Sequence, residues 1–132
     1  IYEPALGPVD WIGWEFLSWL ISGGESQKGS RPSHPDWHRT ARDFCAENGI
    51  PYLFKQWGDW APWIDRQRDD PDWRLDYSNT YSEGPDVRWL NTAGGRGFHG
   101  DRFHVMAKRG KSRAGRLLDG VEHNGMPETR ND

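Results

Sequence analysis

A helix whose two ends are marked in the sequence lies between two short apolar runs, and this arrangement constrains the fold most. Ser33 is a candidate N-cap, Pro35 suits the first helical turn, and Asn48-Gly49 is a typical stop. The apolar runs, 14–21 before the helix and 50–54 after it, have the length of strands buried on both faces. The order strand, loop, helix, strand therefore predicts a right-handed βαβ unit with parallel strands.

The predicted helix carries one apolar stripe. Trp37, Ala41, Phe44 and Cys45 follow one another at helical spacing, and charged residues occupy the other faces. We expect this stripe to pack against the strands and Cys45 to be a thiol buried in the core. Because a single cysteine forms no internal disulfide, the composition also favours a reducing, cytoplasmic setting.

Regular patterns weaken after Gly58. We expect an irregular, Trp-rich stretch with one short helix near 62–68, and then a hairpin of two strands at 86–90 and 102–107. The loop 94–100 between these strands is rich in glycine but lacks the Gly-Lys-Ser/Thr ending that cradles nucleotide phosphates.

These patterns together predict an α/β protein in three parts. The parts are a parallel βαβ part over 1–58, a Trp-rich region and hairpin packed on it over 59–127, and a frayed tail over 128–132.

Leu, Ile, Val and Phe are scarce, since together they make up only 22 of the 132 residues, whereas nine residues are Trp. A net charge of -3 is too small to hold the chain open by self-repulsion, so we expect a folded domain. A core built from Trp is the favoured interpretation. The alternative is a Trp surface on which sugar rings or single-stranded bases stack.

The start of the chain suggests a second explanation for the thin core. It begins at Ile1 without an initiator Met, as if inside a strand, and we therefore expect an N-terminal half to be missing. The strands at 14–21 and 50–54 would then have an open sheet edge, along which the chain could self-associate. No apolar run approaches the 18 or so residues that cross a bilayer, and the mean hydropathy is -0.98, so no membrane association is expected.

Polar residues follow both predicted parallel strands, at the edge where ligands bind in such sheets. The segment after the first strand includes glycines that permit close backbone approach and side chains that accept or donate hydrogen bonds. The candidate residues of this edge are Gly23, Gly24, Glu25, Ser26, Lys55 and Gln56, with Arg31 and His34 just before the helix. The alternative is structural: the glycines turn the chain, and Glu25 pairs with Lys55 or Arg31.

Metal binding is not expected. His34 and His38 are four residues apart at a helix start, but that spacing alone is a weak signal. One cysteine cannot by itself provide a zinc knuckle or an iron-sulfur site. For His99 and His104 we expect solvated positions.

Five of the nine residues from 108 to 116 are Lys or Arg, which would suit contact with the phosphates of a nucleic acid. A solvated, salt-bridged surface strand is the favoured interpretation. The near-neutral net charge gives no general attraction to nucleic acid, so any such binding would be local.

Several blocks of residues, in this order, resemble the phage Gp37/Gp68 family, also called DUF5131, over residues 1 to about 127. They are Glu3-Pro4-Ala5-Leu6-Gly7-Pro8-Val9-Asp10, Ser22-Gly23-Gly24-Glu25-Ser26 with Arg31-Pro32, His34-Pro35-Asp36-Trp37, Phe54-Lys55-Gln56-Trp57-Gly58, Gly110-Lys111 and Ala114-Gly115-Arg116-Leu117-Leu118-Asp119-Gly120.

This resemblance implies a partial (β/α) barrel and radical S-adenosylmethionine chemistry on an unknown substrate, in the cytoplasm of a phage-infected bacterium. The three-cysteine motif that holds a [4Fe-4S] cluster in such proteins is absent here, so the resemblance implies a carboxy-terminal half that is inactive alone. The missing amino-terminal half would then be its partner. The competing hypothesis is a non-catalytic phage module that binds nucleic acid or protein.

The resemblance also assigns roles to the candidate residues. The positions it implies for S-adenosylmethionine are Glu3, Gly23, Gly24, Glu25 and Ser26, and those for substrate are Arg31, His34, Lys55 and Gln56.

Overall fold

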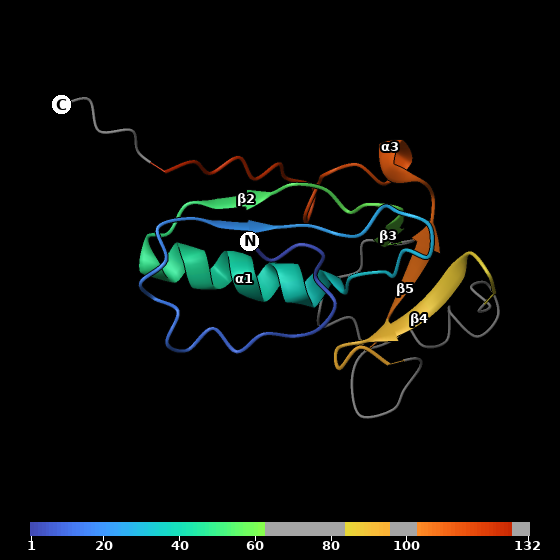
Figure 1. Ribbon diagram of the computed structural model, residues 1–132, viewed down its shortest axis with the longest axis horizontal. Helices are drawn as coiled ribbons and strands as arrows, with labels where there is room; N and C mark the ends of the chain where they lie inside the picture. The colour runs from blue at the N-terminus through green and yellow to red at the C-terminus, as the bar shows by residue number, and fades with distance from the viewer. Residues whose placement is uncertain (63–83, 96–102, 128–132) are drawn as a thin grey trace.

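The computed structural model describes residues 1–62, 84–95 and 103–127 of the chain. Within these residues the protein is a mixed α/β domain with two sheets and two helices (Figure 1). The elements are β1 (Leu20–Ser22), α1 (Pro35–Asn48), β2 (Tyr52–Phe54), β3 (Trp60–Pro62), β4 (Val87–Asn91), β5 (Phe103–Lys108) and α3 (Lys111–Ala114).

The predicted βαβ unit is present. β1 and β2 pair in parallel, with Leu20 opposite Tyr52 and Ser22 opposite Phe54, and α1 connects them. On the other side of β1, Tyr2 forms a parallel bridge with Ser22. Three parallel segments therefore end at one edge.

The helix α1 has the predicted bounds but a different cap. His34, not Ser33, is the N-cap, and its Nδ1 accepts a hydrogen bond from the backbone N–H of Asp36 at 3.0 Å. The Ser33 hydroxyl instead contacts Nε2 of His38 at 2.7 Å, so it is engaged inside the fold. At the other end Gly49 adopts a left-handed φ of 65° and donates its backbone N–H to Cys45, as a C-terminal glycine does.

The strand predicted at 14–21 is mostly wrong, because only Leu20 and Ile21 enter β1. Residues 14–19 form turns, in which the N–H of Trp14 and that of Leu17 are used in local backbone hydrogen bonds. Trp14 is 45% exposed and Phe16 is 75% exposed. Their rings stack on one another at 5.8 Å instead of entering the core, so an apolar composition was not sufficient evidence for a strand.

The predicted hairpin is confirmed, since β4 and β5 pair antiparallel, but the sheet has a further strand. β3 pairs with the other side of β5, which gives the order β3-β5-β4. Residue 62 therefore belongs to a strand and not to the short helix expected near 62–68, whose other residues lie outside the described ranges. Because this sheet is antiparallel, the described residues form no closed barrel, and the expected partial (β/α) barrel is not supported.

Tryptophan supplies much of the core, as predicted. Trp37, Trp57 and Trp60 are almost completely buried within one cluster that includes residues of both sheets. The indole N–H of each donates to a distant backbone carbonyl, of Thr92, Leu117 and Ser30 respectively. Each ring therefore provides apolar area and also ties two segments of chain together. Cys45 is buried as well, as expected.

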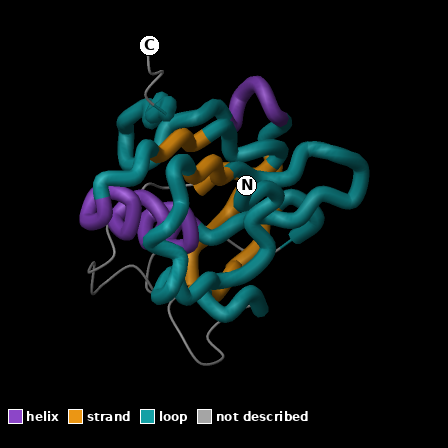
Figure 2. Tube along the Cα trace, turned by 60° about the vertical axis from the view of Figure 1, so that its left-hand side comes forward, coloured by secondary structure: helices purple, strands orange, loops and turns teal. Residues whose placement is uncertain are grey.

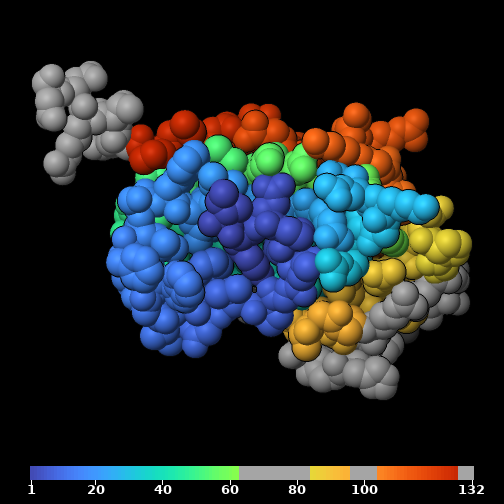
Figure 3. Space-filling model, in the orientation of Figure 1, coloured from blue at the N-terminus to red at the C-terminus, as the bar shows by residue number. Residues whose placement is uncertain are grey.

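The chain after residue 120 packs against the parallel sheet. Residues 123–125 run along the outer edge of β2: the carbonyl of His123 accepts from Phe54, and the N–H of Gly125 donates to Tyr52. Figures 1 and 3 show this last segment, in red, lying beside the green β2, and Figure 2 shows the long helix α1, in purple, beside the orange strands. The predicted frayed tail, 128–132, lies outside the described ranges. Neither described helix has the length and apolar character needed to cross a membrane.

Candidate functional site

The ends of the three parallel segments bring predicted residues together. Glu3 follows Tyr2, Gly23 follows β1 and Lys55 follows β2. The ammonium of Lys55 lies 3.4 Å from Oε2 of Glu3, and the two side chains are 56% and 21% exposed. A Cβ added at Gly23 would lie 3.4 Å from the Glu3 side chain, so these three residues lie together, although Gly23 itself is buried. A carboxylate and an ammonium there could contact a polar ligand.

Gly24 has a structural reason to be glycine. Its N–H donates to the carbonyl of Gln56, and a Cβ added to it would lie 1.8 Å from the carbonyl oxygen of Trp57. Gly58 packs in the same way against Glu25: a Cβ added to Gly58 would lie 2.3 Å from the carbonyl oxygen of Glu25. The φ of 86° at Gly58 also favours glycine. The two strand ends therefore pack backbone against backbone.

Glu25 is held by Arg31. Its Oε1 accepts from the backbone N–H and from Nε of Arg31, at 2.9 and 3.1 Å, and its Oε2 accepts from Nη2 at 3.0 Å. These hydrogen bonds hold the pKa of Glu25 below its usual value. The ion pair between Glu25 and Arg31, which was one alternative from the sequence, is thus present. It closes the loop in which the half-buried Ser26 lies.

His34 lies inside the protein, where it caps α1. It is 2% exposed, and its ring lies 6.1 Å from that of Trp37 and 5.9 Å from that of His104. The expectation that His104 is solvated is wrong, because β5 carries it into the interior. His99 lies outside the described ranges.

A buried polar chain runs beneath the parallel sheet. Nε2 of His38 contacts the Ser33 hydroxyl at 2.7 Å, and Nδ1 contacts the Ser22 hydroxyl at 3.0 Å. The Ser22 hydroxyl also lies 2.6 Å from the hydroxyl of Tyr52. Complete burial, with a contribution from the charge of His34, lowers the pKa of His38 to about 3, so the ring is neutral at pH 7.

No group of three or more His, Cys, Asp or Glu that could hold a metal occurs within residues 1–62, 84–95 and 103–127. Cys45 also lacks the character of a cluster ligand, because it is buried in α1 and burial raises the pKa of its thiol to about 11.

A cavity of about 310 Å³, which the sequence did not reveal, lies where the start of α1 meets Trp57, β3, α3 and the turn at 117–120. Its charged lining residues are Arg39, Arg109, Arg113 and Asp119. The basic stretch 108–116 therefore does not form the predicted surface strand: it ends β5, forms α3 and contributes two arginines to this wall.

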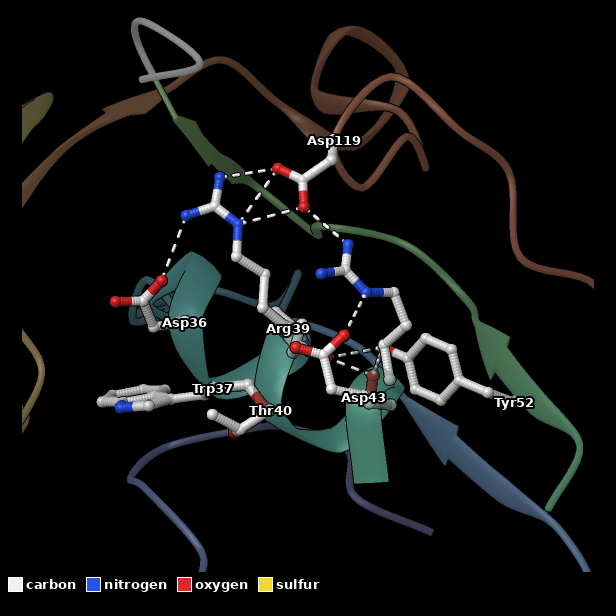
Figure 4. A network of polar contacts seen from close by, with 10 residues as sticks. Asp36, Trp37, Arg39, Thr40, Asp43, Tyr52 and Asp119 are labelled. Carbon is white, nitrogen blue, oxygen red and sulfur yellow. Dashed lines mark hydrogen bonds and ion pairs between the residues drawn. The ribbon is translucent and has the colours of Figure 1, made fainter. Parts of the chain in front are cut away.

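Asp119 links this turn to α1 (Figure 4). Its carboxylate accepts from Nη2 of Arg39 at 2.7 Å and from Nη1 of Arg42 at 2.6 Å, while Nη1 of Arg39 donates to Asp36 at 3.1 Å. Burial alone would raise the pKa of Asp119, but the hydrogen bonds from both arginines outweigh this effect and the pKa is lowered.

A local signal for this turn does exist in the sequence. Asp119 and Gly120 both have positive φ, and Leu118 and Val121 exchange two backbone hydrogen bonds around them. Asp-Gly is a typical pair for such a two-residue hairpin turn. The partners of Asp119, by contrast, are Arg39 and Arg42, which lie 80 and 77 residues away, and no local pattern indicates them.

Comparison with known proteins identifies one family. The model of a family described as a protein of unknown function (DUF5131) matches residues 1–127. No curated protein and no solved structure matches the chain.

Proposed function

Because the chain belongs to the DUF5131 family, we propose that it is the carboxy-terminal part of a phage Gp37/Gp68-like enzyme that uses S-adenosylmethionine for radical chemistry in the cytoplasm. The observation that supports this proposal is the meeting of Glu3, Gly23 and Lys55 at the end of three parallel segments. Ligands of parallel sheets bind at this edge.

A [4Fe-4S] cluster does not fit the residues present. Such a cluster requires several thiolates, and the one cysteine is buried with a raised pKa. The proposal therefore places the cluster on residues of a longer protein, and this chain alone would not be catalytic.

S-adenosylmethionine itself carries groups that the polar side chains of this edge can bind. The carboxylates of Glu3 and Glu25 can accept hydrogen bonds from ribose hydroxyls or an ammonium group, and the buried Gly23 packs against the Glu3 side chain. Gly24 and Ser26 shape the same loop. In this proposal Lys55, Gln56 and the exposed Arg31 face the substrate, and the buried His34 holds the start of α1 beside them.

The test is calorimetric titration of S-adenosylmethionine into the chain and into its Glu3→Gln and Lys55→Gln variants. Glu3→Gln should weaken binding about tenfold, because one charge-assisted hydrogen bond is lost. Lys55→Gln should weaken the binding of substrate more than the binding of S-adenosylmethionine. The exposed Glu47→Gln and Lys28→Gln variants serve as matched charge controls. Equal affinity in Glu3→Gln and Glu47→Gln would contradict the assignment of Glu3.

A second candidate function is a non-catalytic module that binds nucleic acid, favoured by the exposure of Lys108, Arg109, Lys111 and Arg113. Binding of single-stranded DNA should then fall steeply with added salt, because phosphate contacts release counterions. Absence of binding at low salt would remove this candidate.

A further inference from the structure

The loop before β1 exposes a group of large apolar side chains, and in Figure 1 it is the blue segment that passes below α1. Ile12 is 84% exposed, Phe16 is 75% exposed and Trp14 is 45% exposed. The rings of Trp14 and Phe16 stack at 5.8 Å, and Trp11 joins them to α1 by stacking on Phe44 at 5.7 Å. We call these five residues the loop patch. Exposed apolar residues that lie together in this way mark interaction sites.

The loop patch is held in one shape by the rest of the protein. Trp11 and Leu17, on either side of its exposed part, pack against the hydrophobic core. The N–H of Trp14 donates to the carbonyl of Trp11 at 3.0 Å, that of Leu17 donates to Trp14 at 3.1 Å, and that of Ile12 donates to Asp10 at 3.0 Å. A partner therefore meets a surface that is already ordered, which reduces the entropic cost of binding.

The surroundings of the loop patch are acidic. Residues 1–27 include no Lys or Arg, whereas Asp10 and Glu15 are exposed in the loop itself. Glu47 is exposed one turn after Phe44, and the last turn of α1, where the helix dipole is negative, includes no basic residue. Within the part of the chain that the structure describes, none of these three carboxylates forms an ion pair.

This charge favours one class of partner. An anionic membrane or a nucleic acid would bring phosphates toward the carboxylates. On α1, Arg42 offers them no free cation, because it is already paired with Asp43 and Asp119. A protein segment with Lys or Arg beside apolar side chains complements both the charge and the apolar surface.

The backbone of the loop indicates the form of that segment. Three of its N–H groups, those of Ile12, Trp14 and Leu17, are used in local hydrogen bonds, so the loop does not present a strand edge to a partner. Contact therefore depends on side chains. An amphipathic helix presents apolar side chains on one face and basic side chains next to them.

We propose that the loop patch binds a basic amphipathic helix of a partner protein. The apolar face of this helix packs on Ile12, Trp14 and Phe16, and its Lys or Arg side chains lie beside Asp10 and Glu15. The aromatic rings supply most of the affinity, and the carboxylates at the rim increase the rate of association. No residue of the loop patch belongs to the edge proposed for S-adenosylmethionine, so the two proposals can fail separately.

The test measures the fluorescence anisotropy of a labelled synthetic helix of Leu and Lys as the chain is added. A helix in which Glu replaces every Lys should bind much more weakly. Phe16→Ser should weaken binding of the Leu/Lys helix about tenfold, because an aromatic contact is lost. Glu15→Gln should weaken it about threefold and reduce its dependence on salt, as loss of a rim charge does.

The matched controls change the same kinds of side chain elsewhere on the surface. Leu117→Ser removes an apolar side chain that is 52% exposed beside α3, and Glu122→Gln removes an exposed carboxylate. Both should leave the affinity unchanged. Ile12→Ser is a second variant of the loop patch and should weaken binding as Phe16→Ser does, since both side chains are largely exposed and contribute little to folding.

Four results would overturn the proposal. They are absence of binding to the Leu/Lys helix, equal affinity for the Leu/Glu helix, equal weakening by Phe16→Ser and Leu117→Ser, and binding to anionic lipid vesicles that Phe16→Ser abolishes. Light scattering of the chain alone tests a second copy as the occupant. A dimer that Phe16→Ser dissociates would replace the proposed helix with that copy.

Discussion

At the scale of single residues, His38 is a titratable group that the fold keeps neutral. Both of its ring nitrogens contact serine hydroxyls, of Ser33 and Ser22, and no part of the side chain reaches solvent. A charged imidazole here would lose its hydration and gain no carboxylate among these contacts, so its pKa falls to about 3. Protonation of His38 is thus coupled to unfolding.

This coupling predicts how stability depends on pH. The folded pKa of His38 lies below the unfolded value of about 6.5, so the unfolded chain binds more protons between the two values. The stabilisation is complete above about pH 6.5 and is lost as the pH falls toward 3. Between pH 5.5 and 4.5 this residue alone should lower the free energy of unfolding by about 1.4 kcal/mol.

Urea denaturation of the native chain and of His38→Gln, at pH 7.5, 5.5 and 4.5, measures this contribution. The variant should be less stable at pH 7.5 but should lose less stability on acidification. His123→Gln is the control, because burial lowers the pKa of His123 as well, yet that side chain lies closer to the surface. If the native chain and His38→Gln lose equal stability on acidification, the account of His38 is wrong.

At the scale of elements, the ends of β1 and β2 are joined by close backbone packing. Gly24 lies against the carbonyl of Trp57, and Gly58 lies against that of Glu25. Side chains at these positions would separate the strand ends, which carry the candidate residues Gly23 and Lys55. The geometry of that edge therefore depends on two glycines that contact no ligand in the proposal.

Gly24→Ala should lower the free energy of unfolding by about 3 kcal/mol, because the new Cβ would lie 1.8 Å from a backbone oxygen and the strands would have to move apart. Gly23→Ala is the matched control one residue away, since its Cβ would make contacts of 3.4 Å, an ordinary van der Waals distance. Thermal unfolding compares the two variants directly. Similar midpoints for both would show that the strand ends tolerate separation.

At the scale of the whole molecule, distant segments complete the small parallel sheet. Tyr2 adds to the side of β1, and residues 123–125 occupy the outer edge of β2. The predicted self-association along an open edge would therefore have to displace one of these segments. The fit at Gly125 is close, since an added Cβ would lie 2.4 Å from the backbone nitrogen of Tyr52.

Gly125→Ala should expose the edge of β2 and increase self-association, because unpaired strand edges are templates for pairing with another chain. Light scattering coupled to size-exclusion chromatography, over a range of protein concentrations, measures this change. Gly7→Ala is the control, as no atom lies within 4 Å of its added Cβ. An unchanged molar mass for Gly125→Ala would show that the C-terminal segment does not protect this edge.

The sequence by itself determined the features that depend on near neighbours. The helix ends at Pro35 and Gly49, the parallel pairing of β1 with β2, and the hairpin of β4 and β5 were all predictable. The helix ends depend on backbone angles and hydrogen bonds within a few residues, and the two strand pairings follow from the order of the elements along the chain. The candidate edge was also predictable in outline, because the carboxyl ends of parallel strands meet.

The tertiary structure alone decided which side chains meet across the chain. It placed Trp14 at the surface and Trp60 in a strand of the second sheet, although both belong to Trp-rich stretches. It also joined Asp119 to Arg39, 80 residues away, and formed the arginine-lined cavity around them. Such contacts depend on how complete elements pack together, and the free energy of that packing is not encoded in any short window of sequence.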